Sequence, residues 1–245
     1  MSREVDLQET VGRIVERGAL QMGVALPIGA GAAFDAYRAA LELHGKNVNL
    51  TSITGAEDVA RLHFLDSLAL LLASDFKNAR VIDIGSGAGF PGLPLKIAEQ
   101  TIELTMLDAT GKRVSFLSAL CAELGVSAAC IHARAEESAR EPQLRERFDI
   151  ATSRAVARLN VLCELCLPFV RVGGVFLAMK GTDSTEELEE ALGAIQMLGA
   201  EHDNTVDYTI ADTDITHRIL VIRKTSQTPE EYPRRFAKMK RPVGR

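Results

Sequence analysis

The sequence lacks any apolar run near the roughly 18 residues that a membrane-spanning helix needs, so we expect no membrane segment. Residues 1–8 carry charges but no apolar stretch of the kind found in a secretory signal, and we expect a cytoplasmic protein. Internal repeats and low-complexity segments are also missing. What remains is a globular chain of 245 residues, 47% of them hydrophobic, long enough for one large domain or two small ones.

Cysteine is scarce, and the four residues present, at positions 121, 130, 163 and 166, all fall in apolar segments. Buried thiols of this kind are typical of a reduced, cytoplasmic protein. Cys163 and Cys166 form a C-x-x-C pair, but the second pair that would complete a zinc site is missing. We therefore expect both sulfurs to pack in the core on a helix over 160–170, and we expect no metal.

Acidic residues are absent from the end of the chain. Residues 233–245 hold six basic side chains and no carboxylate, although the whole chain has a net charge of −5. A basic tail on an acidic body favours contact with a polyanion such as RNA, and a solvated terminus is the alternative. The candidate RNA contacts are Arg234, Arg235, Lys238, Lys240 and Arg241.

The most informative segment that the sequence does contain is a glycine-rich loop after an apolar strand. Residues 81–94 read Val-Ile-Asp-Ile-Gly-Ser-Gly-Ala-Gly-Phe-Pro-Gly-Leu-Pro. The acid is Asp83, and a helix is expected to open at Pro91, where a missing N–H costs little. Free amides and the helix dipole there attract a negative or polar group. The loop therefore predicts a ligand site at the end of the first strand, where open α/β sheets bind ligands.

Two classes of nucleotide cofactor compete for this loop. Residues 87–92 match G-x-G-x-x-G, and Asp108 lies near the spacing of a ribose-binding acid, which favours a dinucleotide. Three features oppose it: the match starts two residues late, Pro91 removes an amide, and Asp83 would repel two phosphates. S-adenosyl-L-methionine fits better, because it carries a sulfonium, an ammonium and one carboxylate. A glycine-rich turn that binds nothing is the third alternative.

Alternating apolar strands and helical patterns predict a parallel α/β sheet within a domain over 76–228. Strands are expected over 81–84, 102–107, 128–131, 148–152 and 174–179, with an antiparallel edge pair over 206–210 and 218–223. Helices are expected over 91–99, 112–124, 160–170 and 185–198, with a polar turn over 134–137. Residues 1–75 are expected to form a helical extension on this core, with helices over 33–43 and 54–75. Residues 229–245 are the basic tail.

Several blocks of sequence carry a resemblance to a known family. They are Asn49-Leu50-Thr51, His63-Phe64-Leu65-Asp66-Ser67, residues 83–94, Asp108-Ala109-Thr110-Gly111-Lys112-Arg113-Val114, Arg134-Ala135-Glu136, Ser153-Arg154-Ala155 and Tyr232-Pro233-Arg234-Arg235. Their order and spacing resemble the bacterial 16S ribosomal RNA guanine-N7 methyltransferases of the RsmG type, over nearly the whole chain. The chain departs from the family's pattern at 236–239, where Phe-Ala-Lys-Met replaces the usual glycine and proline.

The resemblance implies a class I S-adenosylmethionine-dependent methyltransferase fold, a Rossmann-like seven-stranded sheet whose last strand is antiparallel. It implies S-adenosyl-L-methionine as the donor and S-adenosyl-L-homocysteine as the product. The implied acceptor is N7 of one guanine in the 16S decoding-region loop. The implied partner is 16S rRNA, in a small ribosomal subunit or an assembly intermediate, and we expect a monomer. A different RNA or a small molecule is the alternative acceptor.

The resemblance also implies which residues hold the donor. It places the loop after the first strand at the methionine end, residues 108–110 at the ribose and adenine, and residues 135–136 beside the adenine. Arg154 would face the reacting end. Together with the loop chemistry, the expected cofactor-binding residues are Asp83, Gly85, Gly87, Gly89, Phe90, Asp108, Ala109, Thr110, Ala135, Glu136 and Arg154.

Methyl transfer to guanine N7 needs no obligatory general base, because N7 has a free lone pair and no proton. The sequence fits this, since it lacks both an Asn/Asp-Pro-Pro-aromatic loop and a cysteine after a proline. The catalytic candidates are Arg154 and His63. For His63, which shares a helix face with Ser67, packing of the helix on the sheet is the alternative. For Arg154 the alternative is a surface ion pair.

Overall fold

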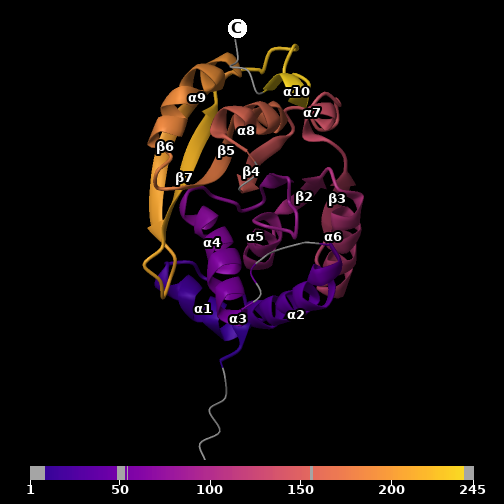
Figure 1. The fold of residues 1–245 in the computed structure, drawn as a ribbon, viewed down its shortest axis with the longest axis vertical. Coiled ribbons are helices and arrows are strands. Elements are labelled where there is room, and N and C mark those ends of the chain that lie inside the picture. The colour runs from indigo at the N-terminus through magenta and orange to yellow at the C-terminus, as the bar shows by residue number, and fades with distance from the viewer. Residues whose placement is uncertain (1–8, 49–52, 54, 155–156, 240–245) are drawn as a thin grey trace, which may run out of the picture.

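One seven-stranded sheet runs through the molecule (Figure 1). The computed structural model describes residues 9–48, 53, 55–154 and 157–239. The strands are β1 (Arg80–Ile84), β2 (Glu103–Asp108), β3 (Ala128–His132), β4 (Phe148–Arg154), β5 (Val170–Gly181), β6 (Ala200–Thr209) and β7 (Thr216–Lys224). Their spatial order is β3-β2-β1-β4-β5-β7-β6, and β7 pairs antiparallel with both β5 and β6. The predicted sheet with an antiparallel last strand is therefore confirmed.

Each face of the sheet is covered by its own helices. These are α5 (Gly92–Ala98), α6 (Gly111–Glu123), α7 (Ala135–Ser138), α8 (Leu159–Cys166), α9 (Thr185–Met197) and α10 (Phe236–Met239). Leu104 and Met106 of β2 join a hydrophobic cluster with α5 and α6, whereas Leu107 joins a second cluster with α7, α8 and α9. Alternate residues of one strand point to opposite faces, so both faces become apolar core.

The first part of the chain forms a layer of helices over one face, shown in indigo and purple in Figure 1. Its elements are α1 (Val11–Gln21), α2 (Ala30–Val48), α3 (Ala56–Val59), a π-helical turn (Ala60–Leu65), α4 (Asp66–Leu68) and a 3-10 turn (Ala69–Leu72). Buried residues of this extension, among them Val11 and Phe64, belong to the same hydrophobic cluster as Leu104 of β2 and Val221 of β7, so the extension packs directly on the sheet. The domain boundaries at residues 75 and 228 stay predictions.

Two expected segments need correction. The helix expected over 54–75 is interrupted by the π-helical turn, and the polar turn expected over 134–137 is the short helix α7. Apolar periodicity predicts that a segment is helical, but it does not show whether the backbone hydrogen bonds follow α or π spacing. For residues 134–137, the polar composition predicted a turn and did not reveal a single turn of helix.

The edge strand β6 (Ala200–Thr209) is longer than its apolar pattern predicts. β6 starts at Ala200, where it pairs with Lys224 of β7, and the stretch before Val206 includes exposed acidic residues. An edge strand buries less of its surface, so its polar residues hide the alternation on which a sequence prediction depends.

Cys163 and Cys166 are both fully buried on α8, which confirms their packing in the core. Within the described ranges, no helix is both long enough and apolar enough to cross a membrane.

Candidate active site

The glycine-rich loop joins the C-terminal ends of β1 and β2. The amides of Gly85 and Ser86 donate to the carbonyl oxygen of Leu107 at 2.8 and 3.2 Å, which extends the pairing of the two strands into the loop. One residue further on, Gly87 N donates to Asp108 Oδ2 at 3.0 Å. Residues from both predicted strand ends therefore meet at one edge of the sheet.

Asp108, the expected ribose-binding acid, is held in place by backbone amides. Its Oδ1 accepts from Thr110 N at 2.8 Å, and its side chain is almost completely buried. Arg113 Nη1 lies 3.6 Å from Oδ2 and partly balances the charge. Ala109 and Thr110 are exposed beside it, where a ligand could reach them. The carboxylate is thus oriented by the protein before any ligand is present.

The loop after β3 lies next to the same strand end. Ala133 N donates to the carbonyl oxygen of Asp108 at 3.2 Å, and α7 begins two residues later. Ala135, at the start of α7, is buried, whereas Glu136 is partly exposed. The structure therefore places the start of α7 close to the end of β2, and the role of these two segments at an adenine stays a prediction.

Asp83 does not face the site as its sequence position suggested. Its carboxylate is fully buried beneath the loop, where Oδ2 accepts from Gly92 N at 3.1 Å and Oδ1 from Thr152 Oγ1 at 3.3 Å. Burial raises the pKa of Asp83 to about 6, although the hydrogen bonds from Gly92, Ser86 and Thr152 oppose this shift. The free helix amide that the sequence offered to a ligand is bonded to Asp83 itself. The expected direct contact with a cationic donor is therefore corrected: Asp83 supports the loop from below.

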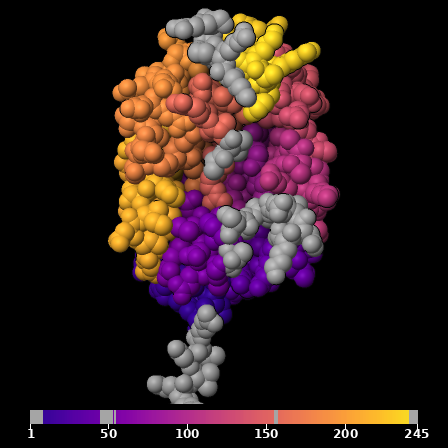
Figure 2. Space-filling model, in the orientation of Figure 1, coloured from indigo at the N-terminus to yellow at the C-terminus, as the bar shows by residue number. Residues whose placement is uncertain are grey.

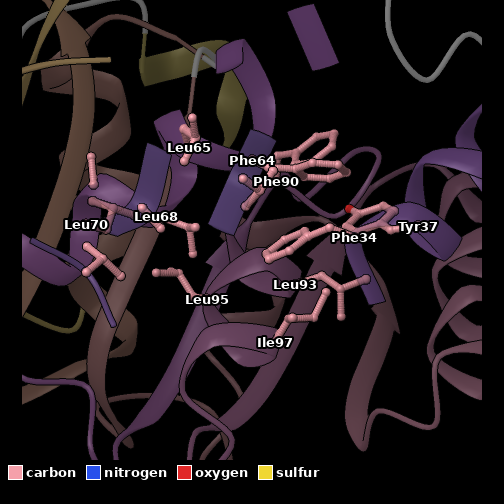
Figure 3. Close-up of a cluster of buried hydrophobic side chains, with 14 of the residues drawn as sticks. Phe34, Tyr37, Phe64, Leu65, Leu68, Leu70, Phe90, Leu93, Leu95 and Ile97 are labelled. Atoms are coloured by element: carbon pink, nitrogen blue, oxygen red, sulfur yellow. The ribbon is translucent and has the colours of Figure 1, made fainter. Parts of the chain in front are cut away.

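Helix α2 and the π-helical turn hold the loop from the other side (Figure 3). The Tyr37 hydroxyl donates to the carbonyl oxygen of Ala88 at 2.6 Å, and the Tyr37 ring stacks on Phe90 with ring centres 5.4 Å apart. Gly89 has a φ of 104°, and a Cβ there would collide with that hydroxyl. Gly89 therefore serves the packing of the helical extension against the loop.

Arg154, at the end of β4, lies over the ring of Phe90, with its guanidinium carbon 4.9 Å from the ring centre. Its Nη1 donates to the carbonyl oxygen of Leu62 at 3.2 Å and to Asp66 Oδ2 at 3.1 Å. Its Nη2 donates to His63 Nδ1 at 3.1 Å. The ion pair that was the alternative for Arg154 exists, but it lies largely shielded between the sheet and the helical extension instead of on the surface.

His63 packs against the glycine-rich loop, as its packing alternative expects, and its catalytic role stays a prediction. It is buried, and its ring stacks on Phe90 at 4.5 Å. Burial, with the charge of Arg154 adding to it, lowers the pKa of His63 to about 4. Nδ1 also lies 3.1 Å from the carbonyl oxygen of Leu62, so it accepts from Arg154 in the tautomer that carries its proton on Nε2. Near neutral pH, the His63 ring is therefore uncharged.

Asp66 ties this group to the far edge of the sheet. Its Oδ1 accepts from the Tyr208 hydroxyl and from His217 Nδ1, both at 2.7 Å. Burial would raise the pKa of Asp66, but the hydrogen bond from His217, the charge of Arg154 and the hydrogen bond from Tyr208 hold it below its usual value. Sequence reasoning missed Tyr208 and His217. The available signal was two polar aromatic side chains directly opposite each other on the edge hairpin.

The basic tail is anchored by its first residues. Arg234 N donates to Glu164 Oε1 at 2.6 Å, Arg234 Nη2 donates to Oε2 at 2.7 Å, and Glu164 is fully buried. Arg234, expected at RNA, is therefore committed to an ion pair inside the protein. Arg235 and Lys238 are exposed. Lys240 and Arg241 lie outside the described residues.

Strand order decides between the two cofactor classes that the sequence left open. Dinucleotide-binding sheets follow the order 3-2-1-4-5-6 with parallel strands. Here an antiparallel β7 is inserted between β5 and β6. This arrangement, with the glycine-rich loop after β1 and the acid at the end of β2, defines a class I S-adenosylmethionine-dependent methyltransferase.

Comparison with known proteins identifies the family. The family model described as rRNA small subunit methyltransferase G matches residues 31–216. A ribosomal RNA small subunit methyltransferase G of Alkaliphilus oremlandii is 48% identical over 204 residues, which cover 82% of this chain and 85% of that protein. The corresponding protein of Clostridium perfringens is 43% identical over the same length and coverage. The chain therefore belongs to the rRNA small subunit methyltransferase G family.

A solved structure supports the fold independently. A protein of Corynebacterium glutamicum superposes with a TM-score of 0.52 at 18% identity, over 79% of this chain and 91% of that one. At that identity, the likeness shows the fold alone. Family membership confirms the predicted enzyme class, a methyltransferase that uses S-adenosyl-L-methionine.

Proposed function

We propose that this chain transfers the methyl group of S-adenosyl-L-methionine to N7 of a guanine in 16S rRNA. The observation that carries the proposal is the cluster at the end of β4, where Arg154 lies over Phe90 of the glycine-rich loop. This cluster and Asp108 stand at the same edge of the sheet. Arg154 matches the carboxylate at the methionine end of the donor, and Asp108 matches the ribose hydroxyls nearer its other end.

The residues present fit the donor chemically. Of the five N–H groups of Arg154, three make hydrogen bonds within the described part of the chain, which leaves two for the donor's carboxylate. Asp108 accepts hydrogen bonds from the ribose hydroxyls, with Ala109 and Thr110 beside it. Ala135 and Glu136 flank the adenine, while Gly85, Gly87, Gly89 and Phe90 shape the wall at the methionine end.

Methylation of guanine N7 requires the enzyme to align N7 with the methyl group of the donor, and it requires no proton transfer from N7. In the reaction, the N7 lone pair forms the new bond to the methyl carbon while the carbon–sulfur bond breaks and its electrons stay on sulfur. No proton leaves N7, and the two side chains that could act as a base, His63 and Asp66, are already hydrogen-bonded to Arg154. Positioning of the two reactants is enough to supply several kcal/mol of the rate enhancement.

The RNA surface that we propose lies where α7 and the tail meet. A surface pocket of about 710 Å³ is lined by residues of both segments, including Arg134, Arg235 and Phe236. Figure 2 shows this tail segment in yellow against the pink α7 region at the top of the molecule. The Phe236 side chain is 44% exposed, so an unpaired base can stack on it while Arg235 and Lys238 meet phosphates.

Labelled methyl transfer tests the proposal. Tritium from S-adenosyl-L-methionine should enter naked 16S rRNA or small subunits that come from cells lacking the native enzyme. Nuclease mapping should then place the label on N7 of a single guanine. Label in neither substrate would refute the proposed function, and label on another RNA would replace its acceptor. A cytoplasmic location and a monomeric state remain predictions, the second of them measurable by light scattering.

A further inference from the structure

A chain of hydrogen bonds centred on the buried Asp66 carboxylate links the edge hairpin β6–β7 to Arg154, and His217 and Arg154 are themselves partly buried. Both oxygens of the Asp66 carboxylate take part: Oδ1 accepts from Tyr208 and His217, and Oδ2 accepts from Arg154. Tyr208 and His217 are directly paired in register across the two strands, so both donors approach the same oxygen from one side. The carboxylate is therefore fixed in rotation as well as in position.

Because Asp66 and Tyr208 are buried, the loss of a hydrogen bond between them would be costly. Asp66 is 3% exposed and Tyr208 is 6% exposed, and a buried polar atom that loses its partner costs more than a surface one. Without the two donors on Oδ1, the carboxylate would be free to turn, and its bond to Arg154 would lose direction. Arg154 itself has a second constraint, because Leu62 and His63 bind it from the π-helical turn.

We propose that Tyr208 and His217 are positioning residues for methyl transfer. They orient Asp66, and Asp66 in turn holds the Arg154 guanidinium over Phe90. The inference rests on the proposed role of Arg154 in holding the donor. It makes the C-terminal hairpin, far from the loop in sequence, part of the geometry of the donor site.

Donor binding by the full-length chain tests this role without depending on RNA. We expect Tyr208→Phe and His217→Ala each to raise the dissociation constant for S-adenosyl-L-homocysteine about tenfold by calorimetry, because each removes a hydrogen bond to a charged group. His217→Asn should restore the affinity, since its amide nitrogen can donate from the place of Nδ1. A general weakening of the hairpin would not be rescued in this way.

A neighbouring surface pair provides the matched control. Asp207 precedes Tyr208 on β6 and bonds to Arg218 of β7 on the exposed side at 2.7 Å. Asp207→Asn changes the same two strands without touching Asp66, so its dissociation constant should equal that of the parent protein. Melting curves of all variants establish that they are folded. If Tyr208→Phe did not fold, the two His217 variants would carry the comparison alone.

A double-variant experiment tests whether Tyr208 affects donor binding through Arg154 or independently of it. In an Arg154→Gln background, Tyr208→Phe should change the dissociation constant no further, because its effect passes through the arginine. Unchanged affinity in folded Tyr208→Phe, or losses that multiply in the double variant, would overturn the inference. Unchanged affinity in Arg154→Gln alone would overturn it together with the role of Arg154, whereas the methyl-transfer assay would still decide the proposed function.

Discussion

Two buried carboxylates show how single residues acquire different chemistry in one site. Asp66 has a cation and two donors, and its pKa lies below the usual value even though burial opposes this. Asp83 has only neutral donors against its carboxylate, and burial raises its pKa to about 6. Near neutral pH, Asp66 is therefore a carboxylate anion that pairs with Arg154. The pKa of Asp83, about 6, lies only a little below neutral pH, so a fraction of its carboxyl groups is protonated.

The raised pKa of Asp83 predicts a pH-dependent cost of folding. The folded state binds this proton more tightly than the unfolded state, so the stabilisation is present below the ordinary pKa of 3.8 and is lost as pH rises through about 6. Asp83→Asn removes that titration. Relative to the parent protein, its unfolding free energy should rise by about 2 kcal/mol between pH 4 and pH 7. Urea unfolding at both pH values measures this, and parallel pH profiles would contradict it.

Asp108 should control donor affinity. Asp108→Ala removes the carboxylate that is expected to accept from both ribose hydroxyls, so the dissociation constant for S-adenosyl-L-homocysteine should rise on the order of tenfold to a hundredfold. Glu103→Ala is the control, because Glu103 is an exposed acid at the opposite end of the same strand. Calorimetry distinguishes the two, and equal affinities for both variants would rule out the role of Asp108.

At the scale of elements, the π-helical turn matters most. Residues Ala60–Leu65 present the Leu62 carbonyl oxygen and the His63 ring to Arg154, and α4 follows at once with Asp66. π-helical turns are rare and recur at functional sites. A regular helix over the same residues would rotate these groups apart, so this local irregularity builds one side of the site.

Gly89 tests the contact between the loop and α2. Gly89→Ala should destabilise the protein by more than about 2 kcal/mol, because it adds backbone strain and a collision with the Tyr37 hydroxyl. Gly125→Ala is the control, since Gly125 also has a positive φ, 63°, but no atom lies within 4 Å of an added Cβ. It should cost about 1 kcal/mol.

Thermal unfolding of both glycine variants separates the collision from the strain. Combining Gly89→Ala with Tyr37→Phe should recover part of the loss, because it removes the colliding oxygen. Equal destabilisation of the two glycine variants would show that the tyrosine does not constrain the loop.

At the scale of the whole molecule, the tail is part of the folded body up to α10. Arg140 donates to the carbonyl oxygens of Glu230, Glu231 and Pro233. Arg145 donates to those of Thr228, Pro229 and Tyr232. These contacts fix the start of the tail against the segment between α7 and β4, so the exposed Arg235 and Lys238 lie at a defined place.

This arrangement predicts that two adjacent arginines have different roles. Arg234→Ala leaves Glu164 buried without its cation and should destabilise the protein by about 3–5 kcal/mol. Arg235→Ala should leave stability within about 0.5 kcal/mol and reduce the salt dependence of RNA binding by slightly less than one log unit per decade of salt. Denaturant unfolding and filter binding at several salt concentrations measure both quantities. A reversed pattern would mean that Arg234 is the residue that contacts RNA.

The sequence alone determined the fold class, the position of the glycine-rich loop after β1 and the position of Asp108 at the end of β2. These features depend on strand periodicity and turn chemistry, which are set by neighbours along the chain. It also indicated Arg154 and His63 through resemblance to a family. It could not place Asp83 beneath the loop, commit Arg234 to Glu164, or bring Tyr208 and His217 to Asp66. Those contacts join residues about 70 to 150 positions apart, and only the packing of helices and edge strands on the sheet decides them.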